Sequence, residues 1–415
     1  MRDKLRSITN HSVSKNTLAL IILQLANALI PLLVIPFLTR TLGIEKFGVV
    51  AVVLAVIQLA YVITDYGFSL SASFAISQSR EDKKAVSELI GAVFFLKLCL
   101  SSLAAILVFL YGLVILSNMD AEPLFFIAPL AIFGQAFQPI WFFQGIEKMK
   151  NVTIYMVVVR CLYAVLILIF VSKPEDAWVV VFMWGISHTV GAFLAIWRVY
   201  AEGYRILLPN RSKLLAVFKE SSQFFASRVA VSLYTSASTV VIGSTGGVVQ
   251  AAHFSVCEQL YKGGQSVTGP INQALYPYMA KNRDWTLFYK VIIVVGSLIA
   301  LGCLSLSFFS TNILILFFGE EYRDASTVLM IFLAVNVVNY FGVSFGYPAH
   351  AATGDVSFAN TSVILGSVLH VAVLCVLIML SDVSAFTVTL TILATETTVL
   401  LIRLYNIRMQ SLLRA

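Results

Sequence analysis

The residues best placed to do chemistry in this sequence are charged side chains within long apolar stretches. There are seven, four basic and three acidic: Lys97, Arg160, Arg228, Lys262, Asp65, Glu258 and Glu396. A charge at the centre of a bilayer costs at least about 2.5–3.5 kcal/mol on insertion scales, so it normally faces protein or a water-filled cavity. At about 1.5 Å per residue, Lys97, Arg160 and Arg228 lie roughly 10–14 Å from one end of their helices. The sequence therefore predicts a polar interior inside a membrane protein.

Two stretches add polar residues at helical spacing. One carries a polar stripe formed by Arg228, Ser232, Thr235 and Thr239. In the other, Glu258 and Lys262 are four residues apart and can pair, close to Tyr261 and Gln265. Arginine and lysine can replace the hydration of a diphosphate, which does not cross hydrocarbon unaided. The predicted lumen suits a substrate that is anionic and rich in sugar.

Other readings of these charges stay open. Lys97 is long enough to snorkel to the membrane surface, and Asp65 is close enough to an interface to pair with basic loop residues. Glu258 and Lys262 can equally form a purely structural pair. Arg160 and Arg228 lie too deep for easy snorkelling, which favours roles in a cavity.

Composition places the chain in a membrane. Of its 415 residues 59% are apolar and 12% are charged, and the mean hydropathy is +0.90. A soluble protein has about a quarter of its residues charged. The net charge of +7 comes from short loops between apolar stretches, which indicates orientation in a bilayer and no nucleic acid partner. Five cysteines lie in apolar stretches without metal-ligand spacing, so we expect no disulfide, metal or cofactor.

The apolar stretches predict an all-α integral membrane fold with twelve transmembrane helices. We place them at 16–38, 47–70, 88–116, 122–145, 152–171, 177–200, 221–242, 247–276, 286–309, 326–350, 357–380 and 385–405. With the N-terminus in the cytoplasm, 20 of the 28 basic residues lie on the cytoplasmic side. This bias predicts that both termini are cytoplasmic.

Echoes between the two halves predict a duplicated six-helix unit. Leu42-Gly43 ends the first predicted helix and Ile242-Gly243 ends the seventh, while Pro139 and Pro348 each precede a glycine by six residues. Parallel repeats of this kind place a site at their interface. We expect an N-terminal bundle at 1–200, a cytoplasmic connecting loop at 201–220 and a C-terminal bundle at 221–415.

Five segments resemble one family of transporters. They are IPFLTRTLGIEKFGVV (35–50), DYGFSLSASFAISQSRED (65–82), QPIWFFQGIEKMK (138–150), FFASRVAVSLYT (224–235) with CEQLYKGGQSVTGPINQALYPYMAK (257–281), and LFFGEEYRDASTVLMIF (316–332). In this order they resemble the Wzx-type O-antigen flippases. That family is part of the superfamily that also holds MATE exporters and the lipid II flippase.

The resemblance implies two six-helix bundles around a central cavity in the bacterial inner membrane. It implies translocation of undecaprenyl-diphosphate-linked repeat units to the periplasmic face during lipopolysaccharide biosynthesis, by alternating access coupled to H⁺ or Na⁺. Carried over by motif, Asp65, Arg228, Glu258, Lys262 and Gln273 become candidate site residues. Gln259 follows Glu258 where similar proteins commonly have lysine, which puts a fixed local ion pair there in doubt.

The resulting hypothesis is capture from the cytoplasm. Arg160 and Arg228 attract the diphosphate, supported by Lys262, Lys97, Gln265 and Gln273. Aromatic residues stack near the sugar or gate the path: Trp141, Phe142, Phe143 and Tyr261. Asp65, Glu258 and Glu396 are the candidate cation-coupling groups, and contacts with the polymerase and chain-length proteins are a further expectation.

Two rival functions remain at this point. One is a MATE-like antiporter of drugs and cations, which predicts a more acidic lumen than four basic against three acidic residues. The other is a membrane enzyme that polymerises or ligates the lipid-linked sugar. The sequence lacks P-loop and H-E-x-x-H motifs, and it offers little external loop for catalytic groups. We therefore predict that the chain is not an enzyme.

Overall fold

The computed structural model describes residues 12–115 and 122–412, with side chains described outside 12–28, 115, 122, 226–228, 230–235 and 411–412. In these ranges the regular secondary structure is helical, without strands. The predicted all-α membrane fold is confirmed.

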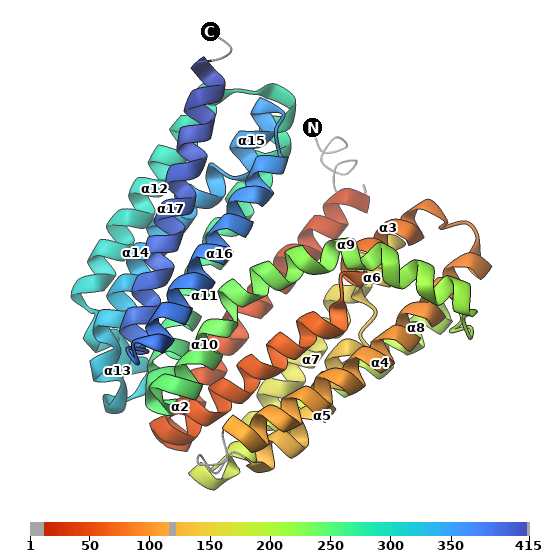
Figure 1. The fold of residues 1–415 in the computed structure, drawn as a ribbon, viewed down its shortest axis with the longest axis horizontal. Coiled ribbons are helices and arrows are strands. Elements are labelled where there is room, and N and C mark those ends of the chain that lie inside the picture. Colours follow the sequence, from red (N-terminus) through yellow and green to blue (C-terminus); the bar gives the residue numbers. More distant parts are fainter. Residues whose placement is uncertain (1–11, 116–121, 413–415) are drawn as a thin grey trace, which may run out of the picture. The chain divides into compact units, whose positions relative to one another are not determined.

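Figure 1 traces the helices in chain order. The elements before the second predicted bundle are α2 (Ser12–Asp65), α3 (Phe68–Gln78), α4 (Lys83–Ile115), α5 (Glu122–Ala136), α6 (Ile140–Gly145), α7 (Met149–Phe170), the 3₁₀ turn η2 (Pro174–Asp176) and α8 (Ala177–Ala201). They are followed by α9 (Arg211–Thr235), α10 (Ala237–Val241), the π-helical η3 (Ile242–Gly246), α11 (Val248–Asn282), α12 (Trp285–Phe308), α13 (Ser310–Phe318), the 3₁₀ turn η4 (Glu320–Ala325), α14 (Ser326–Ser344), α15 (Tyr347–Thr353), α16 (Ser357–Met379) and α17 (Ala385–Leu412).

Helices cover all twelve predicted spans as far as the structure describes them. Within the described residues, nine helical segments are long and apolar enough to cross a membrane. One of them, Leu29–Gln78, contains parts of two predicted spans. The predicted spans at 221–242 and 247–276 fall on α9 to α11, which are not among the nine; part of α9 lies outside the residues whose side chains are described. The number twelve therefore stays a prediction.

The chain divides into two compact units. Unit 1 comprises Met1–Ile30 and Val53–Ser232, and unit 2 comprises Pro31–Val52 and Leu233–Ala415. The predicted bundles at 1–200 and 221–415 stay a prediction. The connection between α8 and α9 is shorter than the predicted loop at 201–220, because Asn210 starts a helix. Its Oδ1 accepts a hydrogen bond from the backbone N–H of Lys213 at 2.8 Å, as an N-cap residue does.

Unit 1 is built around an aromatic core. Trp141, Phe142 and Phe143 of α6 are each at most 1% exposed and pack in this core against α3, α4 and α7. The ring of Tyr66, between α2 and α3, stacks on Phe218 of α9 with centroids 4.6 Å apart. Aromatic pairs of this kind contribute about 0.5–1.5 kcal/mol each to helix contacts.

The segment 31–52 packs entirely within unit 2. The guanidinium of Arg40 donates to the carbonyls of Leu316 and Phe317, at the C-terminal end of α13. A cation at this position compensates the unpaired carbonyls and the negative end of the helix dipole. The N–H of Ile44 donates to Glu321 Oε2 at 2.9 Å. These contacts explain why the loop at Gly43 belongs to unit 2.

The two units share a broken-helix arrangement. In unit 1 α5 stops at Ala136 and resumes as the short α6 after Pro139, while in unit 2 α14 stops at Ser344 and resumes as α15 around Pro348. Proline lacks a backbone N–H and cannot continue the hydrogen-bond ladder of a helix. The spacing echo in the sequence thus falls on the same feature of each unit.

The second echo shifts by four residues. Gly43 has φ 73° and ψ 167°, and a similar conformation is found at Gly247, four residues after Gly243, with φ 96° and ψ 159°. Gly243 instead packs on Val52, where an added Cβ would lie 2.1 Å from Val52 Cγ2. The predicted equivalence of Gly43 with Gly243 is wrong at the level of backbone conformation, because Gly243 is fixed by packing and Gly247 by its positive φ.

Candidate functional site

A buried lysine and a buried aspartate form the first charged centre of unit 1. Lys97 of α4 is 1% exposed, and its Nζ donates to the carbonyl of Ala136 at 2.9 Å. Ala136 ends α5, so its carbonyl lies at the negative end of a helix. Asp65 is 5% exposed, accepts a hydrogen bond from Ser69 Oγ and interacts electrostatically with Lys97. Lys97 does not snorkel to the surface and Asp65 does not lie at one.

Arg160 of α7 occupies a second polar cluster in unit 1. Its guanidinium lies 5.4 Å from the ring centroid of Trp184 in α8. His188, one turn further along α8, has its ring 4.5 Å from that of Trp184 and shares a 2.9 Å hydrogen bond through Nδ1 with Gln138 Nε2. Cation–π contacts of desolvated arginine contribute about 2 kcal/mol. The aromatic ring therefore holds the guanidinium in place without neutralising its charge.

Two polar atoms of this cluster have no hydrogen-bond partner among the described residues. Trp184 and His188 are 8% and 4% exposed, yet Trp184 Nε1 and His188 Nε2 are buried without a hydrogen-bond partner. Among the residues whose side chains are described, no carboxylate forms a salt bridge with Arg160. Buried polar groups are normally paired, so unpaired ones around a cation indicate a place that a polar ligand or water can fill.

In unit 2, a chain of hydrogen bonds joins three of the predicted site residues. Gln265 Nε2 of α11 donates to Tyr261 Oη at 2.7 Å and to Asn339 Oδ1 of α14 at 3.0 Å. Asn339 Nδ2 in turn donates to Glu396 Oε1 of α17 at 3.1 Å. Glu396 is 9% exposed, and Tyr261 also stacks on Phe332 with centroids 5.4 Å apart.

Asn339 is the residue that sequence reasoning missed in this chain. The signal available was a pair of amides, Asn336 and Asn339, in the middle of a largely apolar predicted span. Alone it does not indicate which distant helices it connects, because the link depends on α11 and α17 lying on either side of α14.

The remaining predicted residues of α11 are more exposed. Lys262 Nζ and Glu258 Oε1 form the expected ion pair at 2.8 Å, with side-chain exposures of 50% and 15%. Gln273 is exposed. The side chain of Arg228 lies outside the described residues, so its predicted role in capture is untested.

The side chains of three predicted aromatic residues and of one arginine are more buried than the sequence indicates. Trp141, Phe142 and Phe143 are buried in the core of unit 1, and their predicted stacking or gating role stays a prediction. Arg403 is one of the basic residues counted on the cytoplasmic side, and that side stays a prediction. Its side chain is 6% exposed and donates to Ser362 Oγ at 2.8 Å, to the Gly342 carbonyl at 2.6 Å and to the Ala359 carbonyl. It is therefore buried against α14 and α16, and α17 continues to Leu412, seven residues past the predicted end.

Metal chemistry has no support in the part of the chain that the structure describes. Groups of three or more His, Cys, Asp or Glu that could hold a metal ion are absent there.

Comparison with known proteins identifies relatives over most of the chain. The profile of the polysaccharide biosynthesis protein family matches residues 13–283. A protein described as a candidate O-antigen transporter of Escherichia coli strain K12 is 29% identical over 349 residues, which cover 80% of this chain and 83% of the relative. A lipopolysaccharide biosynthesis protein of the same strain, WzxC, is 26% identical over 340 residues, with coverage of 77% and 66%.

Solved structures of two transporter types share the fold. An inward-facing multidrug resistance transporter of the MATE family superposes with a TM-score of 0.70 at 16% identity, over 95% of this chain and 99% of that chain. The lipid II flippase MurJ, in an inward closed conformation, superposes with a TM-score of 0.71 at 11% identity, over 95% and 87%. At these identities the likeness concerns the fold.

Proposed function

Since the chain belongs to the polysaccharide biosynthesis protein family, we propose that it is a flippase for lipid-linked O-antigen repeat units. It is a multi-pass bacterial membrane protein and a transporter, not an enzyme. In the proposed cycle an undecaprenyl-diphosphate-linked oligosaccharide enters from the cytoplasmic face of the inner membrane and leaves at the periplasmic face. Both termini are then cytoplasmic, as the distribution of basic residues predicts.

The observation that carries this proposal is the state of Arg160. A guanidinium within a membrane span is held by the Trp184 ring, without a salt bridge among the described side chains and beside two unpartnered buried donor or acceptor atoms. A phosphate oxygen is the ligand such a group binds most strongly, through charge-assisted hydrogen bonds. Sugar hydroxyls match the remaining polar atoms of Trp184 and His188.

Coupling to a cation is assigned to the buried acids. Asp65 interacts with Lys97, and Glu396 accepts a hydrogen bond from the Asn339 amide. Protonation of either acid changes the charge of its unit, and a ligand that binds one conformation better than another shifts the balance between them. In this scheme a proton or sodium ion entering from the periplasm favours the conformation that is open to the opposite face.

A drug/cation antiporter is the second candidate function, favoured by the fold shared with a MATE transporter. It predicts that substrates are cationic and meet the acids directly. Loss of the chain would then sensitise cells to cationic drugs and leave surface sugar unchanged.

The test uses a host strain that lacks its own flippase and displays O-antigen only when this chain is expressed with its cognate repeat unit. Arg160→Ala removes a charge-assisted hydrogen bond of about 1.5–3 kcal/mol, so we expect surface O-antigen to fall roughly 10-fold or more at equal protein level. The matched control is Arg198→Ala, an exposed arginine that also lies over a tryptophan ring, Trp197, at 5.2 Å.

The control variant is expected to display O-antigen like the unmodified chain. If the Arg160→Ala variant displayed as much O-antigen as the unmodified chain, Arg160 would not capture the substrate. Failure of the unmodified chain to restore display, together with drug sensitivity in its absence, would replace the flippase by the antiporter.

A further inference from the structure

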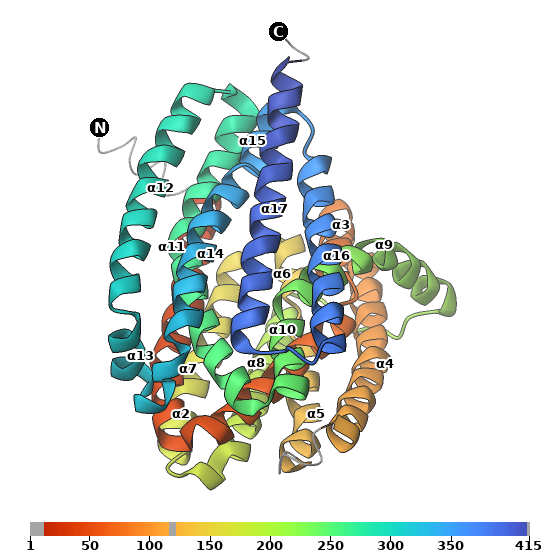
Figure 2. The same ribbon diagram turned by 60° about the vertical axis from the view of Figure 1, so that its left-hand side comes forward.

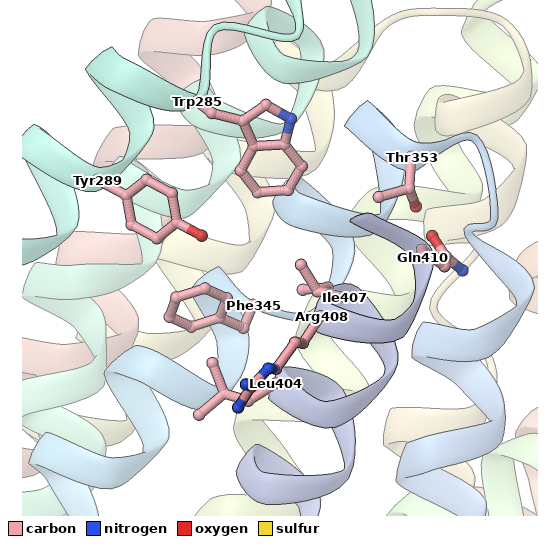
Figure 3. Close-up of a pocket in the computed structure, with 8 residues that line it drawn as sticks. All are labelled: Trp285, Tyr289, Phe345, Thr353, Leu404, Ile407, Arg408 and Gln410. Carbon is pink, nitrogen blue, oxygen red and sulfur yellow. The ribbon is translucent and has the colours of Figure 1, made fainter. Parts of the chain in front are cut away.

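A cavity of about 520 Å³ lies in unit 2, at the ends of α12, α15 and α17. Figure 3 shows the residues that line it: Trp285, Tyr289, Phe345, Thr353, Leu404, Ile407, Arg408 and Gln410. The start of α12 and the end of α17 lie at the same end of this unit in both ribbon views (Figures 1 and 2). Pockets for small organic ligands typically measure about 300–1,000 Å³.

One wall of the cavity is aromatic. Trp285 and Tyr289 are one turn apart on α12, with ring centroids 6.0 Å apart and planes 32° from parallel. Phe345, which follows α14, lies 6.3 Å from Tyr289 and is 8% exposed. These rings present flat apolar surface beside polar groups, a combination that suits the apolar faces of a sugar ring.

The wall formed by α17 carries two polar side chains, Arg408 and Gln410, beside the apolar Leu404 and Ile407. Arg408 supplies a guanidinium at the edge of the cavity, and Gln410 supplies an amide (Figure 3). Gln410 Nε2 donates to Asn406 Oδ1 at 3.1 Å, and Asn406 Oδ1 also contacts His350 Nε2 at 3.2 Å. The amide orientation is thereby fixed. Gln410 Oε1, in contrast, is buried and has no hydrogen-bond partner in the structure.

A buried acceptor without a partner indicates that a donor belongs beside it. A sugar hydroxyl supplies such a donor, and so does the ammonium or hydroxyl group of a phospholipid headgroup, so the experiment below must distinguish the two lipids. Arg408 fits a phosphate oxygen through a charge-assisted hydrogen bond. The cavity therefore combines an aromatic wall, a cation and a fixed acceptor within the size of a glycosyl phosphate.

We propose that this cavity is an entry subsite that binds the glycosyl phosphate headgroup of the lipid-linked substrate through Trp285, Tyr289, Arg408 and Gln410. The inference rests on the proposed function, since it requires a lipid-linked sugar as substrate. The subsite lies at the helix ends that the charge bias assigns to the cytoplasm, where the substrate is present before transport. It is separate from the Arg160 cluster, which belongs to unit 1.

The experiment captures whatever occupies the cavity in living cells. A photo-reactive phenylalanine derivative replaces Tyr289 in the full chain, expressed in the host that makes the cognate lipid-linked sugar, and the crosslinked lipid is identified by mass spectrometry. The same derivative at Ile293, one turn further along α12 and 60% exposed, is the matched control. We expect a glycosyl diphosphate adduct at 289 and phospholipid adducts at 293.

A second substitution tests the cation. Combined with the derivative at 289, Arg408→Gln should reduce the glycosyl adduct about 10-fold, while Lys290→Gln, an exposed lysine beside Tyr289 that does not line the cavity, should leave it unchanged. A phospholipid adduct at 289, no adduct there, or an adduct insensitive to Arg408→Gln would each overturn the subsite. Surface O-antigen, scored in the same cells with the unmodified chain, reports separately on the proposed function.

Discussion

The polar centres within the spans of the two units differ in the groups that surround their charges. In unit 1 the cation Lys97 is held by a helix-end carbonyl and interacts with the buried acid Asp65, while Arg160 lies against an aromatic ring. In unit 2 the buried acid Glu396 accepts a hydrogen bond from the amide of Asn339, and the buried cation Arg403 donates to a hydroxyl and to backbone carbonyls. An amide N–H can donate to a carboxylate and to a protonated carboxyl group alike.

The difference suggests a division of tasks. Cations that keep their charge suit an anionic substrate, while an acid whose partner tolerates both protonation states suits reversible binding of a proton. Substitutions at each centre test this division, because the effect on stability or transport should follow from the groups that surround the charge.

The largest effect is expected at Lys97. Lys97→Met leaves the Ala136 carbonyl without its charged donor and removes a cation that interacts with buried Asp65, and a hydrogen bond to a charged group contributes about 1.5–3 kcal/mol. Lys262→Met is the control from unit 2, because its i,i+4 pair with Glu258 is half exposed and such pairs contribute about 0.3–0.5 kcal/mol. Thermal unfolding of both variants in detergent measures the difference.

The double variant Lys97→Met with Asp65→Asn sharpens this test. It removes both charges and should recover part of the lost stability, since no buried charge then remains at the pair. Equal destabilisation by Lys97→Met and Lys262→Met would show that the two units do not differ in this respect.

An intermediate effect is expected at Asn339. Asn339→Leu leaves Glu396 and Gln265 without their shared partner, and an unsatisfied buried polar group costs about 1–3 kcal/mol. Asn360→Leu, on the exposed side of α16, is the matched control and should change stability less. Denaturant or thermal unfolding gives the ranking.

Glu396→Gln separates charge from hydrogen bonding at the same centre. The glutamine can still accept from Asn339, so folding should be little affected, while transport should lose its dependence on a proton gradient. If transport by this variant still depended on the proton gradient, Glu396 would not be the coupling group.

The smallest effect concerns two surface acids that follow the short helices α6 and α15. The hydrogen bond and charge of Arg80, whose guanidinium lies 2.9 Å from Glu147, lower the pKa of Glu147. The Ser357 hydroxyl, together with weaker contributions, lowers the pKa of Asp355. A lowered folded-state pKa stabilises the protein above the unfolded-state pKa, about 4.3 for glutamate and about 3.9 for aspartate. That stability is lost as pH falls through the folded-state pKa.

Salt distinguishes these two acids. The pairing of Glu147 with Arg80 is exposed and charged, so added salt should weaken its pH-dependent contribution, whereas the bond from the neutral Ser357 should be affected less. Comparing Glu147→Gln with Asp355→Asn in unfolding at low pH, with and without salt, measures this. A salt response of equal size at both positions would argue against the assignment.

The sequence predicts those features that depend on local spacing. The helical class, the segments that become helices, the Glu258–Lys262 pair and the proline breaks before α6 and α15 follow from hydropathy, i,i+4 geometry and the chemistry of proline. What the sequence could not predict depends on partners far along the chain. Asn339 links α11 to α17, and Arg403 is buried because carbonyls of α14 and α16 receive its guanidinium. Composition alone places such an arginine at a surface.

The placement of residues 31–52 with unit 2 affects how the polypeptide responds to cleavage. A protease cut in the connection between α8 and α9 would leave 31–52 on the N-terminal piece, although Arg40 and Ile44 bind α13 and η4 on the other. The two pieces would stay joined by these bonds after the covalent link is gone. Residues 31–52 would thus hold the two fragments together non-covalently after cleavage.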